Sequence, residues 1–197
     1  MKRSFCTILV TILTISLMSH VTMADDRTTV GDLLKKNIDK VISILKQKDL
    51  KQEEKNCRII EIVTPMFDFS LMAKLTLGKK HWPELSKEQQ KQFEDVFVKH
   101  LKASYLEKLN LYSDEIIVYK PPIQVKKKIY VPTDLISKGN TISMLYKFWK
   151  SKKGWKIYDL EIAGVSVVQS YRSQFDQVLS NGTFEDLLKE LENLGQK

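Results

Sequence analysis

The sequence contains little cysteine, with only 2 among 197 residues. Cys6 lies in an apolar segment close to the N-terminus, so Cys57 is the one cysteine in the rest of the chain. A single thiol cannot form an intramolecular disulfide, and it cannot supply a cysteine-based zinc site. We interpret Cys57 as a small core residue beside Ile59 and Ile60 on a helix.

Long apolar runs are also lacking, apart from one near the N-terminus. That run, from Phe5 to Met18, is shorter than the roughly 20 residues that a membrane-spanning helix needs. It follows two basic residues and precedes small residues at Thr22 and Ala24. This order is typical of a cleaved secretory signal peptide. We therefore predict a signal peptide over residues 1–24 and a single domain over residues 25–197.

Recognisable catalytic and metal-binding motifs are missing as well. Beyond the predicted signal peptide the histidines are His81 and His100, and they lie far apart in the sequence. No metalloprotease, phosphate-loop or nucleophile-elbow motif is present. Asp159 and Glu161 share one side of a predicted strand, as an acid–base pair would, but ion pairing and solvation are the interpretation that we favour. We expect no catalytic residues, no metal and no cofactor.

Positive charge, in contrast, is abundant. Residues 25–197 contain 30 Lys and Arg against 24 Asp and Glu, a formal charge of +6. A signal peptide makes nucleic acid a poor candidate partner. Anionic lipid headgroups, acidic partner surfaces and solubility alone remain as explanations of the excess. We interpret the basic stretch "VKKKIYV", residues 125–131, as one solvated strand face.

The first half of the chain has helical periodicity. Apolar residues recur with a period near 3.6, which predicts helices over residues 29–47 and 51–63. A third helix includes Phe69 and is closed by Gly78. Ser86 and Gln89 have the spacing of a capping box and predict the start of a fourth helix, whose apolar face includes Phe93, Val96, Phe97, Leu101 and Tyr105.

The second half begins with a period of two. It predicts four successive strands, over residues 116–119, 123–131, 141–149 and 155–162, with a hairpin turn at Gly154 before the last. Short connections between successive strands indicate an antiparallel sheet. After Gly164 a helical pattern returns through Val165, Val168, Tyr171, Phe175 and Val178, and a last helix is predicted over residues 184–194.

Two segments of the sequence resemble a known family. Residues 67–109 begin with "FDFSLMAKLTLGKKHW", and residues 155–175 read "WKIYDLEIAGVSVVQSYRSQF". Both resemble the MlaC family, the periplasmic phospholipid-binding component of the Mla lipid-asymmetry transport system, which is also named for toluene tolerance. Ala163 departs from the pattern, because an acidic residue is common at that position.

The resemblance implies an α+β fold of the MlaC-like, NTF2-like cone type. N-terminal helices, a curved four-stranded antiparallel sheet and C-terminal helices are expected to enclose a hydrophobic pocket, with the lipid headgroup at its mouth. The residues that we expect to line this lipid-binding pocket are Met72, Phe97, Leu101, Tyr105, Val125, Ile142, Met144, Tyr146, Val165, Val168 and Tyr171.

The resemblance also implies a function and its partners. It implies a monomeric phospholipid carrier in the periplasm of a Gram-negative bacterium, with phospholipid as cargo and no cofactor. The implied partners are an outer-membrane lipoprotein–porin complex and an inner-membrane ABC transporter that has an MCE-type lipid-binding ring. Two other hypotheses stay open: a small-molecule enzyme on a cone-shaped α+β scaffold that uses Asp159 or Glu161, and an adaptor or chaperone that binds no lipid.

Overall fold

The computed structural model describes residues 25–109 and 115–194. The predicted signal peptide therefore lies outside the described residues. The helices are α1 (Asp26–Leu45), α2 (Gln52–Val63), η1 (Thr64–Met66), α3 (Phe69–His81), η2 (Trp82–Glu84), α4 (Lys87–Leu109), α5 (Val167–Asn181) and α6 (Phe184–Leu194). The strands are β1 (Ile116–Tyr119), β2 (Ile123–Val125), β3 (Lys128–Ser137), β4 (Asn140–Ser151), β5 (Gly154–Ile162) and β6 (Val165–Ser166).

The strands form one antiparallel sheet in the order β1-β3-β4-β5-β6, with β2 also paired to β3. The predicted α+β class is confirmed, although the described part of the sheet has six strands where four were predicted. Residues 123–131 are two strands, because Lys126 adopts a φ of 56° and reverses the chain. The stretch 125–131 thus contains the end of β2, a turn at Lys126 and Lys127, and the start of β3, and it is not one strand face.

Local sequence signals explain several element boundaries. The Gln89 amide donates to Ser86 Oγ at 3.2 Å, and the Ser86 amide donates to Gln89 Oε1 at 3.0 Å, which confirms the predicted capping box. Gly78 interrupts α3 with a φ of 62°. A Cβ at this position would lie 2.8 Å from the Arg172 guanidinium, so both the backbone conformation and the space favour glycine.

Cys57 does not lie in the core. The thiol is exposed on α2, although Ile59 two residues later is buried. Two residues correspond to about 200° around a helix, so the two side chains point in nearly opposite directions. The prediction that Cys57 packs in the core is wrong for this reason.

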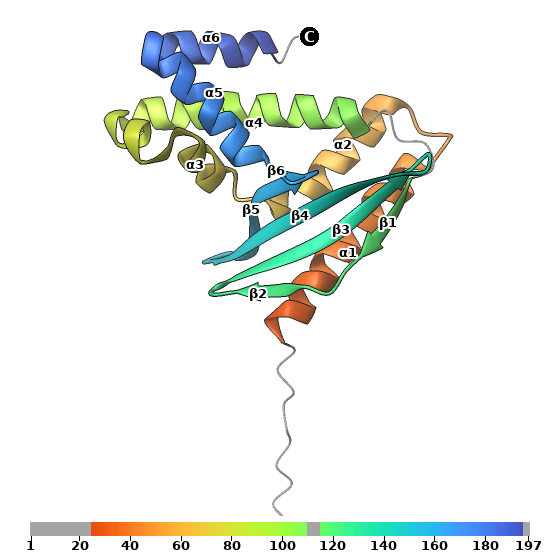
Figure 1. The fold of residues 1–197 in the computed structure, drawn as a ribbon. Coiled ribbons are helices and arrows are strands. Elements are labelled where there is room, and N and C mark those ends of the chain that lie inside the picture. Colours follow the sequence, from red (N-terminus) through yellow and green to blue (C-terminus); the bar gives the residue numbers. More distant parts are fainter. Residues whose placement is uncertain (1–24, 110–114, 195–197) are drawn as a thin grey trace, which may run out of the picture.

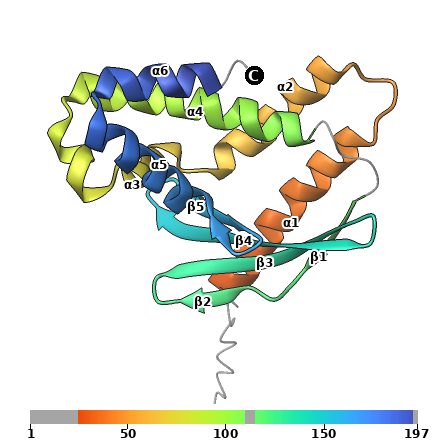
Figure 2. The ribbon, with the colours of Figure 1, turned by 45° about the horizontal axis from the view of Figure 1, so that its top comes forward.

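The elements form two groups, each with its own apolar core. Figures 1 and 2 show α1 crossing one face of the sheet, while α3, α4, α5 and α6 gather together near the edge that contains β5 and β6. One core joins the four gathered helices to β5. The other joins α1 and η1 to the inner face of the sheet through Val30, Leu34, Met66, Ile129, Val131, Phe148 and Ile157.

Candidate functional site

A cavity of about 510 Å³ lies between these two cores. Its walls come from α1, α2, η1, α3 and α4 on one side and from β1, β3, β4 and β5 on the other. The volume falls within the range of small-molecule binding sites in proteins. The helices and the sheet therefore leave room for a ligand where they face each other.

The sheet contributes alternate residues to this cavity. Ile142, Met144 and Tyr146 of β4 all line it, as the two-residue period of a strand requires. On β5 the alternation is broken by a register shift opposite Lys147 and Phe148. Because of this shift, Ile157 and Leu160 both line the cavity although they are three residues apart.

The first two helices contribute most of the opposite wall. Their side chains are almost all aliphatic, and the lining residues are Leu34, Asn37, Ile38, Val41, Ile42 and Leu45 of α1 with Ile59, Ile60 and Val63 of α2. The Tyr119 hydroxyl donates to Asp39 Oδ1 at 2.8 Å and fixes α1 against β1. This wall is held in place by polar contacts outside the cavity and presents hydrocarbon to its interior.

Few polar groups reach the cavity. Lys102 and Glu115 are the charged residues among those that line it, and the Ser137 hydroxyl donates to Glu115 Oε1 at 3.0 Å. Burial raises the pKa of Tyr105 to about 12, with smaller contributions from other residues, and burial likewise raises the pKa of Tyr146 to about 12. Both hydroxyls are neutral at physiological pH, and most of the lining suits the apolar part of a ligand.

Comparison with known proteins identifies the family. The model of the MlaC protein family matches residues 35–193, which is most of the chain. The chain belongs to the MlaC family. A search of curated proteins finds no match.

A solved structure has a similar fold. It is that of a phospholipid-binding protein from Ralstonia solanacearum in complex with a phospholipid. That protein is 24% identical to this chain, with a TM-score of 0.73, and the match covers 88% of this chain and 98% of the other. The similarity confirms the MlaC-like α+β fold that the sequence predicts for this member of the family.

Six of the predicted pocket residues surround the cavity. They are Met72, Leu101, Tyr105, Ile142, Met144 and Tyr146. They come from α3 and α4, which follow each other in the sequence, and from β4, which lies about 30 residues further along. The lining residues of α1 and α2 were not among the predicted site residues, although their helical apolar pattern was recognised.

Three other predicted residues lie in the packed helical core. Phe97 and Val168 are buried there, and Tyr171 packs edge-on against Phe97 with ring centroids 5.3 Å apart. The Tyr171 hydroxyl lies 2.9 Å from Nε2 of His100, a buried histidine whose pKa is lowered by burial. His100 is thus a core histidine, and this group of side chains does not reach the cavity lining.

The remaining two predicted residues lie elsewhere. Val125 is half-buried in the short strand β2, and Val165 is 61% exposed in β6. Val165 was assigned to the helix that follows Gly164, but that helix begins at Val167. The two intervening residues form β6, which turns the Val165 side chain outward.

A buried carboxylate holds this junction between strand and helix. Asp159 accepts from Lys147 Nζ at 3.0 Å, from Ser166 Oγ at 2.8 Å and from the Val168 amide at 3.1 Å. Lys147 also forms an ion pair with Glu161. Asp159 and Glu161 therefore share one lysine on the face of the sheet opposite the cavity, as the ion-pairing interpretation predicted. The junction places Val167 in the cavity wall.

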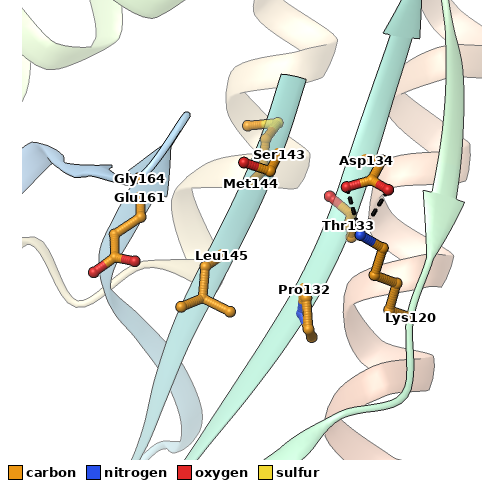
Figure 3. Close-up of a pocket in the computed structure, with 9 residues that line it drawn as sticks. All are labelled: Lys120, Pro132, Thr133, Asp134, Ser143, Met144, Leu145, Glu161 and Gly164. Atoms are coloured by element: carbon orange, nitrogen blue, oxygen red, sulfur yellow. Dashed lines mark hydrogen bonds and ion pairs between the residues drawn. The ribbon is translucent and has the colours of Figure 1, made fainter. Parts of the chain in front are cut away.

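The outer face of the sheet has a second, smaller hollow of about 220 Å³. Figure 3 shows Lys120 and Asp134 joined by an ion pair beside Pro132, with Leu145 and Glu161 across the strands. The pair forms at 2.6 Å, so the charges in this hollow are largely compensated. We therefore place the candidate functional site in the larger, apolar cavity.

Residues 25–109 and 115–194 contain no group of three or more His, Cys, Asp or Glu side chains arranged to hold a metal ion. Within these same ranges, none of the helices is long and apolar enough to cross a membrane.

Proposed function

We propose that this protein is a phospholipid carrier of the periplasm that moves lipid between complexes of the outer and inner membranes. The observation that carries the proposal is the cavity of about 510 Å³, which is lined almost entirely by apolar side chains. Membership of the MlaC family supports it, as does the phospholipid bound by the structural neighbour. The predicted signal peptide agrees with a periplasmic location.

The apolar lining matches what such a carrier must do. Roughly thirty acyl methylenes at about 0.8 kcal/mol each represent about 24 kcal/mol of transfer free energy from water. A carrier has to shield these methylenes during transit, whereas its affinity relative to a membrane can be modest because the bilayer is equally apolar. The protein then needs a dry interior and no catalytic group.

We propose specific positions for the cargo. The acyl chains lie between α1 and α2 on one side and Ile142, Met144 and Tyr146 of β4 on the other. Lys102 and Glu115 are the charged lining residues, and a lipid headgroup lies near them. The outer-membrane lipoprotein–porin complex and the inner-membrane ABC transporter with an MCE-type ring are the proposed donor and acceptor, and the carrier acts as a monomer.

Native mass spectrometry of protein purified from the periplasm without detergent tests the proposal. The wild-type protein is expected to carry added masses that match diacyl phospholipids, and lipid extraction of the same sample identifies them. Replacing Met144 by Trp fills the cavity, and replacing Ile142 by Trp fills it nearer the exposed side, since Ile142 is 36% exposed. Both variants are expected to lose most of the bound lipid.

Val165→Trp is the matched control. Val165 is also a β-branched strand residue, but it is exposed and lies outside the cavity. This variant is expected to retain lipid at the wild-type ratio, and circular dichroism checks that all variants are folded. A wild-type protein that is empty in repeated preparations would contradict the carrier function and favour an adaptor.

A further inference from the structure

Two hairpin turns at one end of the sheet carry lysine pairs. Lys126 and Lys127 form the turn between β2 and β3, and Lys152 and Lys153 form the turn between β4 and β5. The two turns lie side by side, because Lys128 pairs with Trp149 near the end of β4 (Figure 1). We call these four residues the lysine tip.

The lysine tip is not neutralised by neighbouring acidic residues. All four side chains are exposed, and none has an ion-pair or hydrogen-bond partner among the residues that the structure describes. Lys150, close to the tip, is paired with Asp26. The positive charge of the lysine tip is therefore not compensated by an acidic side chain of the described residues.

The tip is part of a wider separation of charge along the chain. Residues 116–158 contain ten lysines and one acidic residue, Asp134, which is paired with Lys120. This segment carries +9, against +6 for residues 25–197 as a whole, so the remainder of that domain carries −3. Asp159 and Glu161 follow in the last part of β5, so the sheet as a whole, residues 116–166, carries +7. The positive charge of the protein is thus concentrated in the sheet, outside the last part of β5.

The local geometry does not account for a lysine at position 126. Its φ of 56° lies in the left-handed region, where glycine and asparagine are favoured and other residues are strained. The neighbouring turn has the expected glycine, Gly154, with a φ of 92°. Lys138 and Ala163 also adopt a positive φ, at two other turns of the sheet, so this conformation is not confined to the lysine tip.

The chemistry of the tip fits a membrane surface better than a shaped protein site. The cluster consists of lysines, which act as point charges without the planar geometry by which arginine recognises a defined partner. Neither cavity described above includes a tip residue. Ile123, which is 51% exposed, adds an apolar side chain on the neighbouring β2. Clusters of four to eight basic residues are attracted to anionic lipid surfaces.

We propose that the lysine tip docks this protein on membranes that contain anionic phospholipid. The tip lies at one end of β4, and Ile142 lines the cavity near the other end, ten residues away from Lys152. At about 3.3 Å per residue these positions are roughly 30 Å apart. Docking through the tip leaves the Ile142 end of the cavity uncovered, so this surface acts separately from the proposed cargo site.

Vesicle flotation tests the docking surface. The probes are vesicles of phosphatidylcholine alone and of phosphatidylcholine mixed with phosphatidylglycerol, at low salt and at about 0.15 M ionic strength. The wild-type protein is expected to bind only the mixed vesicles, and less tightly at the higher salt. The variant with Gln at Lys126, Lys127, Lys152 and Lys153 is expected to lose affinity at least about tenfold.

A charge-matched control has Gln at Lys36, Lys40, Lys91 and Lys99, which are exposed lysines of α1 and α4. It is expected to bind the mixed vesicles within about twofold of the wild type, since it loses the same net charge away from the tip. The cavity-filling Met144→Trp variant is expected to bind vesicles like the wild type, and the tip variant to keep its lipid cargo. These two results separate failure of the docking surface from failure of the carrier function.

Two results would overturn the proposal. One is equal vesicle binding by the tip variant and the wild type. The other is a wild-type protein that does not bind the mixed vesicles but binds an acidic protein through the same four lysines, which would make the tip a protein interface.

Discussion

The helical core and the space between α1, α2 and the sheet are both bounded by apolar side chains but are filled differently. Between α3, α4, α5 and α6 the aromatic rings of Phe93, Phe97 and Phe175 pack with centroids 5.6 to 6.0 Å apart. Between α1, α2 and the sheet, a cavity of about 510 Å³ remains. Hydrophobic periodicity predicts which side chains are turned away from water, but whether the space between them is filled depends on how the elements are placed.

The largest expected effect of a mutation is in the filled core. Phe97→Ala removes a fully buried ring and is expected to lower the free energy of unfolding by about 3–5 kcal/mol. Ile38→Ala, in the half-buried wall of the cavity, is expected to cost only about 1 kcal/mol, because its neighbours already face open space. Urea denaturation of lipid-free protein measures both values, and equal losses would mean that the two regions do not differ in packing.

The second-largest loss of stability is expected at the junction between β5 and α5, which Asp159 holds together. Asp159→Ala leaves Lys147 with Glu161 as its carboxylate partner and removes the acceptor of the Val168 amide. Removing one partner of a buried ion pair typically lowers the free energy of unfolding by about 3–5 kcal/mol. Because Lys147 keeps its contact with Glu161, we expect a loss of about 3 kcal/mol for Asp159→Ala. Glu161→Ala is the control and is expected to cost less, since Glu161 is more exposed. A loss that is larger for Glu161→Ala would contradict this account of the junction.

The fold was largely predictable because its signals are local. The capping box at Ser86 fixes the start of α4, and the amphipathic pattern of residues 184–194 gives the bounds of α6. The turn at Lys126 was not predictable, because it contains no glycine or asparagine. The two-residue strand β6 was also missed, since Val165 fits the helical period of the residues that follow it.

The cavity was predictable only in part. Met144 and Tyr146, two of the residues expected in the pocket, line the cavity and lie on one face of β4. Phe97 and Tyr171 have equally apolar surroundings in the sequence, but their neighbours Phe93 and Phe175 fill the space around them. The contribution of α1 depends on how this helix crosses the sheet, and the period of its own residues does not contain that information.

A smaller effect, on the pH dependence of stability, is expected from His100 in the helical core. Burial lowers the pKa of His100 from its usual value of 6.5, so the folded protein holds the imidazole neutral. As the pH falls below about 6.5, the unfolded chain binds a proton that the native state does not. The free energy of unfolding is therefore expected to decrease, and His100→Gln to weaken this decrease. Denaturation curves of the wild type and of His100→Gln at pH 7.5 and 5 check this, and an equal decrease in both proteins would contradict it.

The smallest expected effect is at the lysine tip, outside both regions. Lys126→Asn is expected to raise the free energy of unfolding by about 0.5 kcal/mol, because asparagine tolerates the left-handed conformation better. Lys127→Asn is the control, since Lys127 has no positive φ, and it is expected to bring no gain. An equal gain at both positions would show that charge repulsion, and not backbone strain, destabilises the turn.

The central claim is that the cavity between α1, α2 and the sheet holds the lipid. The most direct test is to crosslink a bound photoreactive phospholipid to the residues that surround it. The wild-type protein is loaded with a phospholipid that has a photoreactive group on its acyl chain, irradiated, digested and mapped by mass spectrometry. Labels are expected on α1 between Leu34 and Leu45, on α2 and on β4, where the cavity walls lie. Labels confined to the packed helices around Phe97 and Tyr171, or to the outer face of the sheet, would contradict the claim that this cavity holds the lipid.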